Sequence, residues 1–368
     1  LISGGAPGRL GCMTVSRLVQ LTDARYLAEA GAAGIDLPLE QTPDWDRFDR
    51  AVPGREPWKK LAWQTDGETR ALIALTKMEG RGFHYLWAKH GPMWAGSVPT
   101  AQEEAALRDD LRRLVHGSDR SIAFVRLHAF ASAEDLHDLL QSVTFDRTII
   151  LDLTKDEDQL LAEMKKRGRR DVRKALRDTT MVAADETDRA LDVFPELYEL
   201  LIETGQRDEF GISPRATYER MIEALGPENC RLFTVRREGR PLCWGIVTTT
   251  PTHATYYYAA SSAEGRKAGA PDLLVWSMTC MLRSRGIRTF DMMGIDSDRA
   301  PQLAGVRGFK TKFTEDIAEV AGAWDLPVRP LYYRGLTEAL KAKRVGVAQA
   351  RALLAKVKSL RSGPSPEA

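Results

Sequence analysis

The sequence lacks most of the short signatures by which catalytic and metal-binding proteins are usually identified. Its 368 residues contain four cysteines and no CxxC pair, which argues against a zinc knuckle and against a dithiol redox centre. The six histidines are dispersed, and no Ser-His-Asp, Cys-His, HExxH or P-loop spacing can be assembled. Because no nucleophile stands beside a base, the sequence favours direct attack between two bound substrates over a covalent intermediate. We expect neither a metal site nor a bound cofactor.

Long hydrophobic runs and a large net charge are also lacking. No apolar stretch approaches the roughly 18–20 residues that a membrane span needs, and the first twelve residues are glycine-rich rather than signal-like. The 53 lysines and arginines nearly cancel the 51 aspartates and glutamates, so affinity for an anionic polymer or membrane must come from local clustering. We expect a cytoplasmic protein, with association at the membrane surface left open.

What is present is the composition of an ordinary folded protein, with 43% hydrophobic and 28% charged residues. The length suits two domains. Residues 362–368, rich in Ser and Pro, are typical of a disordered tail.

Strand and helix patterns occur twice in the same order: hairpin, strand, helix, strand. In the first half the segments are 58–64 and 70–77, 83–88, 101–115 and 121–127. In the second half they are 232–236 and 242–248, 254–260, 271–285 and 289–293. The repeat predicts a duplicated α+β domain. A further helix is predicted at 133–140.

The predicted boundary between the two copies is a buried strand at 148–153. Thr154 and Glu157 then fit a capping box that starts a long polar helix, interrupted at Gly168. The predicted division is a first domain at 13–147, a second at 148–322, and a C-terminal segment at 323–361 that packs back on the first domain.

Eight cations lie within thirteen residues of this polar helix, at Lys165, Lys166, Arg167, Arg169, Arg170, Arg173, Lys174 and Arg177. Such a row can neutralise the phosphates of RNA or of anionic lipid head groups. It is equally explained as a solvated helix face balanced by neighbouring acids. A second basic stretch, 341–361, fits an amphipathic helix that packs on the protein body or lies on a membrane or nucleic acid.

A glycine-containing loop precedes the second-copy helix, as in acetyltransferases of the GNAT fold, where a helix N-terminus holds the pyrophosphate of acyl-CoA. Arg266 and Gly269 match part of that loop, but Pro271 has no amide hydrogen to offer a phosphate. The loop is better explained as a helix entry with Pro in the first turn.

Six strings occur in one order along most of the chain, from about residue 40 to about residue 325. They are 85–92, 149–154 running into 164–175, 203–210 with Tyr218, 256–261, 286–295 and 305–313. Together they resemble the Fem family of non-ribosomal peptidyl transferases.

The resemblance implies an α+β fold of two tandem GNAT-like domains with a cleft between them. It implies that an aminoacyl-tRNA co-substrate supplies an amino acid to a peptidoglycan precursor, either lipid II or UDP-MurNAc-pentapeptide. The side-chain amine at the third stem-peptide position would attack the ester carbonyl. The chain has no room for a coiled-coil arm and so resembles the compact FemX-like members.

The resemblance also assigns roles to particular residues. Phe309 and Lys310 match the pair near the transfer site, where the ammonium of Lys310 would stabilise developing negative charge. The residues implied to contact the precursor are Arg207 or Arg215, Tyr218, Tyr256 and Tyr258. Lys165, Lys166, Arg169, Arg170 and Arg173 are the expected tRNA or phosphate contacts. His128, Ala259 and Thr314 depart from the family pattern close to the cleft.

Three alternatives stay open at this point. The same chemistry could act on a peptide natural product, the fold could use acyl-CoA, which Pro271 argues against, or the chain could be a non-catalytic RNA- or lipid-binding module.

Overall fold

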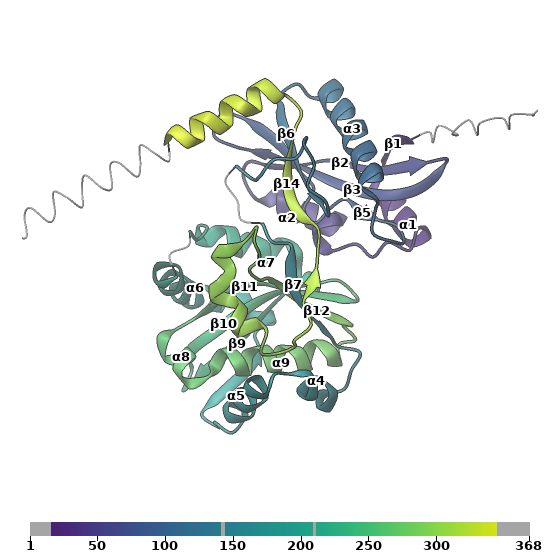
Figure 1. Ribbon diagram of the computed structural model, residues 1–368. Helices are drawn as coiled ribbons and strands as arrows, with labels where there is room; N and C mark the ends of the chain where they lie inside the picture. The colour runs from purple at the N-terminus through teal and green to yellow at the C-terminus, as the bar shows by residue number, and fades with distance from the viewer. Residues whose placement is uncertain (1–15, 141–143, 209–210, 344–368) are drawn as a thin grey trace, which may run out of the picture.

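The computed structural model describes residues 16–140, 144–208 and 211–343, which form two lobes, each built on a seven-stranded mixed sheet (Figure 1). The first sheet has the order β1-β2-β3-β4-β6-β14, with β5 paired to β3. Its strands are β1 (Ser16–Leu21), β2 (Arg55–Thr65), β3 (Glu68–Glu79), β4 (His84–Trp87), β5 (Met93–Trp94), β6 (Ile122–Ala129) and β14 (Gly322–Pro327). Helices α1 (Asp23–Ala32), α2 (Pro43–Ala51) and α3 (Ala101–Ser118) belong to this lobe.

The second sheet has the order β13-β7-β12-β11-β10-β9-β8. Its strands are β7 (Arg147–Asp152), β8 (Met181–Asp185), β9 (Cys230–Arg237), β10 (Arg240–Thr249), β11 (His253–Ser261), β12 (Thr289–Gly294) and β13 (Ala318–Glu319). Its helices are α4 (Glu157–Glu163), α5 (Lys166–Leu176), α6 (Ala190–Arg207), α7 (Arg215–Asn229), α8 (Ala263–Ala268), α9 (Ala270–Ser284) and α10 (Ala304–Lys310). Short 3-10 turns lie at Leu39–Gln41, Thr187–Arg189 and Pro301–Leu303.

The duplicated order predicted from the sequence is confirmed. Each lobe contains an antiparallel hairpin, β2-β3 or β9-β10, followed by a strand, a long helix and a final strand. In both lobes the last two strands are parallel neighbours, β4 with β6 and β11 with β12. The helix between them, α3 or α9, makes the crossover that a parallel pair requires.

Three hydrophobic clusters hold these layers together. One packs α4, α5 and α9 on one face of the second sheet, and another packs α3 against the first sheet. The third covers the other face of the second sheet with α6 and α7, and it includes Trp45 and Phe48 of α2 from the first lobe. Arg47 of the same helix donates from Nε to the Ala224 carbonyl at 3.2 Å. Helix α2 therefore docks the first lobe on the second.

The chain crosses back to the first lobe after β13. Strand β14 pairs antiparallel with β6, and Figure 1 shows it running up from the second lobe between the two. A helix follows at 330–343, and its Tyr333 packs edge-on against Phe124 at 5.3 Å between ring centroids. The rest of the expected C-terminal segment and the tail at 362–368 lie outside the described residues.

The helix predicted at 133–140 is wrong. The backbone of His137 instead forms an isolated bridge with Asp325, and the Leu140 amide donates to the Asp325 carboxylate at 3.1 Å. These partners come from β14, almost two hundred residues away, so the local apolar spacing could not reveal them.

The long polar helix is also divided, because the backbone of Met164 and Lys165 is extended between α4 and α5. The predicted capping box is shifted: Asp156 caps α4 with Gln159 as its partner, whereas Thr154 bonds Asp152. Gly168 does not interrupt a helix. It lies inside α5, where a Cβ would come within 2.2 Å of the Lys312 carbonyl oxygen. Glycine is therefore required by the close approach of α5 to the segment after α10.

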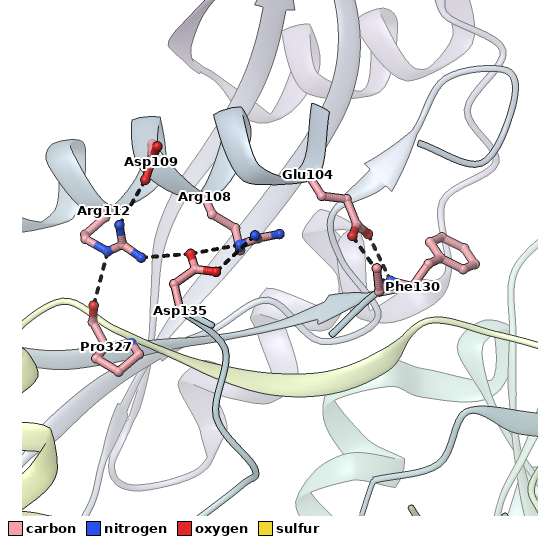
Figure 2. A network of polar contacts seen from close by, with 8 residues as sticks. Glu104, Arg108, Asp109, Arg112, Phe130, Asp135 and Pro327 are labelled. Atoms are coloured by element: carbon pink, nitrogen blue, oxygen red, sulfur yellow. Dashed lines mark hydrogen bonds and ion pairs between the residues drawn. The ribbon is translucent and has the colours of Figure 1, made fainter. Parts of the chain in front are cut away.

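Helix α3 fixes the loop that leaves β6 toward the second lobe (Figure 2). Arg108 and Arg112 both bind the Asp135 carboxylate at 2.9–3.0 Å, and Arg112 also donates to the Pro327 carbonyl. The buried carboxylate of Glu104 accepts the Phe130 amide hydrogen at 2.9 Å. This hydrogen bond fixes the backbone of Phe130 directly after the end of β6.

Candidate functional site

The second sheet opens between its two parallel strands. Strands β11 and β12 pair at three positions, ending at Thr255 and Asp291, and have no registered pairs beyond them. Strand β12 is irregular against β7 between Asp291 and Gly294, and Met293 has a φ of 62°. A Cβ on Gly294 would lie 2.3 Å from the Phe145 ring, so this turn of the backbone is packed tightly. Met293 and Gly294 of β12 therefore have no registered partner on β11.

The side chain of Lys310, the last residue of α10, binds the backbone at this irregular part of β12. Its Nζ donates to the carbonyls of Gly294 at 2.8 Å and Met293 at 3.1 Å. Burial lowers the pKa of Lys310 to about 8, and the nearby Asp291 carboxylate opposes that shift. Asp291 Oδ1 accepts hydrogen bonds from the Thr148 hydroxyl and from the Met293 amide at 2.7 Å. The result is a partly buried cation held rigidly by backbone oxygens.

Phe309, the residue before it, has a supporting place. Its ring is partly buried on the core under α9 and meets the buried Phe313 edge-on at 5.5 Å. Lys312 Nζ lies 5.6 Å from the ring centroid and binds Asp272 and Asp171 at 2.7 and 3.2 Å. Phe309 thus anchors α10 and fixes the position from which Lys310 reaches the β12 carbonyls.

The three tyrosines of β11 do not alternate simply. The register between β10 and β11 shifts after Ile246, which pairs with Tyr258, whereas Val247 pairs with Tyr256. Tyr256 packs on the core under α9, and Tyr258 packs on the opposite core under α6 and α7. Tyr256 and Tyr258 therefore lie on opposite faces of the sheet although they are two residues apart, because a β-bulge changes the faces.

The bulge also affects Tyr257, a residue that the sequence pattern did not single out. Tyr257 packs with Tyr258 on the α6 and α7 side, and its ring centroid lies 5.5 Å from that of Trp45 in α2. It therefore contacts the first lobe across the junction. A bulge of this kind leaves no mark in a run of three identical residues.

Two other expected precursor contacts, Arg207 and Tyr218, lie near the C-terminal end of β11. Arg207 donates to the Ser261 carbonyl at 2.9 Å and to the neighbouring Asp208 carboxylate. Tyr218 is buried, meets Tyr258 edge-on at 4.9 Å, and accepts the Ser213 amide hydrogen at its hydroxyl. Arg215, at the start of α7, is exposed and pairs with Glu219 at 3.0 Å, a surface ion pair of the kind that contributes little stability.

The five expected phosphate contacts differ in their solvent exposure and in their hydrogen-bond partners. Arg169 donates to the carbonyls of Ala162 and Met164 at 2.6 and 2.7 Å, so it closes the end of α4. Lys165 is half-buried, whereas Lys166, Arg170 and Arg173 are exposed. Arg170 pairs with Asp171 at 3.0 Å. The exposed cations of α5 thus form a solvent-facing row beside the second lobe's core.

A cavity of about 520 Å³ lies between the two lobes. The first lobe contributes Asp36, His90, Trp94, His128 and Phe130, and the second contributes His253, Thr255, Asp291 and Glu319. Asp36 and His253 bridge the lobes at 2.5 Å. Sequence reasoning noted His128 only as a departure and missed the others, because they converge from six separate segments. Asp291 links this cavity to the Lys310 site.

The comparisons with known proteins agree with this architecture. The acetyltransferase (GNAT) domain family matches residues 162–310, within the second lobe. The crystal structure of FemX has a TM-score of 0.67 at 16% identity, covering 86% of this chain and 99% of that one. A tandem GNAT protein from the clavulanic acid biosynthesis pathway has a TM-score of 0.50 at 13% identity, covering 84% of this chain and 97% of that one. The predicted α+β fold of tandem GNAT-like domains is confirmed.

One relative is similar at the sequence level. A UDP-N-acetylmuramoylpentapeptide-lysine N(6)-alanyltransferase of Weissella viridescens is 27% identical over 195 residues, which is 52% of this chain. The match spans 56% of that relative's length. The chain is thus a tandem GNAT-fold protein. Its similarity to this relative and to the FemX structure confirms the predicted resemblance to the Fem family.

The described part of the chain contains no helix that is both long and apolar enough to cross a membrane.

Proposed function

We propose that this protein transfers an amino acid from an aminoacyl-tRNA to an amine of a peptidoglycan precursor, either lipid II or UDP-MurNAc-pentapeptide. The observation that carries the proposal is the partly buried Lys310 ammonium, fixed on two β12 carbonyls beside a cavity between two GNAT-like lobes. The named activity of the Weissella relative supports the same class of acceptor.

The proposed reaction needs positioning and charge stabilisation rather than a covalent intermediate. The acceptor amine attacks the ester carbonyl, a C–N bond forms, and the carbonyl oxygen becomes negative. Collapse breaks the C–O bond, and the proton that the attacking nitrogen loses ends on the ribose oxygen, which leaves the tRNA with a free hydroxyl. A preorganised ammonium in a site of low dielectric stabilises either oxygen strongly. Two lobes around a cavity can hold the amine beside the ester.

The exposed cations of α5 are the proposed contact for the tRNA backbone. Replacing Arg170 and Arg173 together by Gln is expected to raise KM for charged tRNA several-fold with little change in kcat. The dependence of log KM on log salt should become shallower by roughly 1–2, because each lost phosphate contact releases about one counterion fewer. Steady-state kinetics at several salt concentrations measures both quantities.

The matched control is Arg113→Gln, which removes an equally exposed guanidinium from the first lobe. It should change neither KM nor the salt slope. An unchanged slope in the α5 double variant would place the tRNA elsewhere.

The two arginines that the sequence left open differ in their surroundings. Because Arg207 is already bound by Ser261 and Asp208, whereas Arg215 is exposed, we propose that Arg215 contacts the precursor. Arg215→Ala is expected to raise KM for the precursor about tenfold or more at unchanged melting temperature. Arg207→Ala should instead lower the melting temperature. A reversed pattern in kinetics and thermal unfolding would favour Arg207.

The reaction itself is tested by incubating the protein with a mixture of charged tRNAs and each precursor, and then weighing the precursor by mass spectrometry. A gain of one amino-acid residue that disappears after RNase treatment supports the proposal. Gain only on a peptide natural product would keep the chemistry and change the acceptor, whereas binding of RNA or lipid without turnover would favour a non-catalytic module.

Acyl-CoA is the less favoured donor on structural grounds. Gly269 caps α9 without a side-chain bond, Pro271 occupies its first turn, and Asp272 faces Lys312 there. A carboxylate and a missing amide hydrogen at this helix start disfavour a pyrophosphate.

A further inference from the structure

The cavity between the lobes has a one-sided charge. Three carboxylates line it, from Asp36, Asp291 and Glu319, and among the described residues its lining contains no lysine or arginine. The other walls are largely apolar, with Trp94 and Phe130 on one side. A phosphate or carboxylate would find no lysine or arginine in this lining, whereas an ammonium group on an apolar stem would find carboxylates as counter-charge and an apolar contact surface.

Two histidines form a pair in the wall of the first lobe. The rings of His90 and His128 are stacked, with centroids 5.2 Å apart and an interplanar angle of 24°. Behind His90 lies the buried carboxylate of Glu40, whose Oε1 is 3.7 Å from His90 Nε2. Among the described residues that oxygen accepts no hydrogen bond.

The protonation of His128 follows from its partners. Its Nδ1 lies 2.8 Å from the Ala321 carbonyl, and because a carbonyl only accepts, Nδ1 must carry the hydrogen. Burial lowers the pKa of His128 to about 3, and His90, Arg299 and Arg126 add to the shift by repelling a second proton. A neutral ring with its hydrogen on Nδ1 has a lone pair on Nε2. The neutral ring can therefore accept a hydrogen bond, and the carboxylates of the lining must offset the repulsion that Arg299 and Arg126 exert on a bound cation.

Asp291 supplies the opposite wall. Among the described residues both of its hydrogen bonds, from Thr148 and Met293, use Oδ1, which leaves Oδ2 to meet a ligand. Met293 also gives its carbonyl to Lys310, so this wall continues directly into the Lys310 site. An amine held by Asp291 therefore lies next to the segment that positions the catalytic cation.

We propose that this cavity binds a primary ammonium group on an apolar stem, with His128 Nε2 as its hydrogen-bond acceptor and Asp291 as its counter-charge. Resting on the proposed function, this ammonium is the acceptor amine, and His128 orients it toward the ester before it gives a proton to solvent water and attacks as the free amine.

The test uses n-pentylamine as the probe and pentanoate as its matched anion, and follows the imidazole resonances of the full chain labelled with ¹⁵N-histidine. His128→Asn assigns the His128 signals, and His116→Asn, at an exposed site on α3, is the control. We expect His128 to show the Nδ1–H tautomer without titrating between pH 5.5 and 8.5. Pentylamine should shift His128 and His90, and pentanoate should shift neither.

Asn at position 128 keeps an amide hydrogen for Ala321 but lacks the Nε2 acceptor. His128→Asn and Asp291→Asn should each weaken pentylamine binding about tenfold or more, and His128→Asn should raise KM for the precursor more than it lowers kcat. A His128 that titrates in this range, equal binding of pentanoate, or pentylamine that perturbs neither cavity histidine would overturn the proposal. Because the probe is not the precursor, amine binding in a protein without transfer activity would sink the proposed function alone.

Discussion

Lys310→Met is expected to lower kcat for amino-acid transfer by about 10²–10³-fold, the usual cost of removing one preorganised stabiliser of an oxyanion. The side chains have similar length, so α10 keeps its apolar contacts through Phe309 while the charge is lost. KM for both substrates should change little, because the ammonium acts on charge that develops in the transition state. Single-turnover kinetics with charged tRNA measures the loss.

The matched control is Lys341→Met, which removes an exposed lysine paired with Glu338 far from the site. It should retain full activity. Equal activity of Lys310→Met and the parent protein, at equal melting temperature, would remove Lys310 from the reaction.

The pH dependence gives a second readout of the same residue. Because burial lowers the pKa of Lys310 to about 8, the ammonium is present below that pH and is lost as pH rises through it. The kcat profile should therefore fall above about pH 8. In Lys310→Arg, a guanidinium retains its charge, so whatever activity remains should not show this alkaline limb.

A buried ion pair holds β14, the strand by which the chain returns to the first lobe. Asp325 of β14 is fully buried and binds the Arg126 guanidinium of β6 through both oxygens, at 2.7 and 3.1 Å. It also accepts hydrogen bonds from the Leu140 amide and the Tyr333 hydroxyl. Asp325→Ala leaves a buried cation without its carboxylate, and we expect it to lower the free energy of unfolding by ~3–5 kcal/mol.

Denaturant unfolding followed by tryptophan fluorescence measures this loss. Asp138→Ala is the control, because Asp138 is almost fully exposed and faces Arg299 across 3.6 Å; it should cost less than about 1 kcal/mol. A loss of similar size in both variants would mean that the buried pair does not hold β14 in place.

The sequence was sufficient for features that depend on local spacing. Alternating apolar residues and a turn at Gly67 located the β2-β3 hairpin, and the repeat of the same order located its counterpart. Lys310 was identified as a candidate site residue from a family resemblance. Its environment was not identified, because the two carbonyls that bind it belong to an irregularity in β12.

Features that depend on long-range partners escaped the sequence. The segment 133–140 has helical spacing, yet its backbone pairs with Asp325, and the β11 bulge turns Tyr257 toward Trp45 of the other lobe. The cavity histidines come from distant segments joined only by the fold. The contacts of His137 with Asp325 and of Tyr257 with Trp45 each join residues more than a hundred positions apart, where periodicity carries no information.

The proposed transfer is tested most directly by locating the amide bond that it forms on the precursor. After incubation with charged tRNA, fragmentation of the precursor by tandem mass spectrometry should place one added amino-acid residue on the side-chain amine at the third stem-peptide position, in the parent protein but not in Lys310→Met. An unmodified precursor, or a residue added equally by the variant, would contradict it.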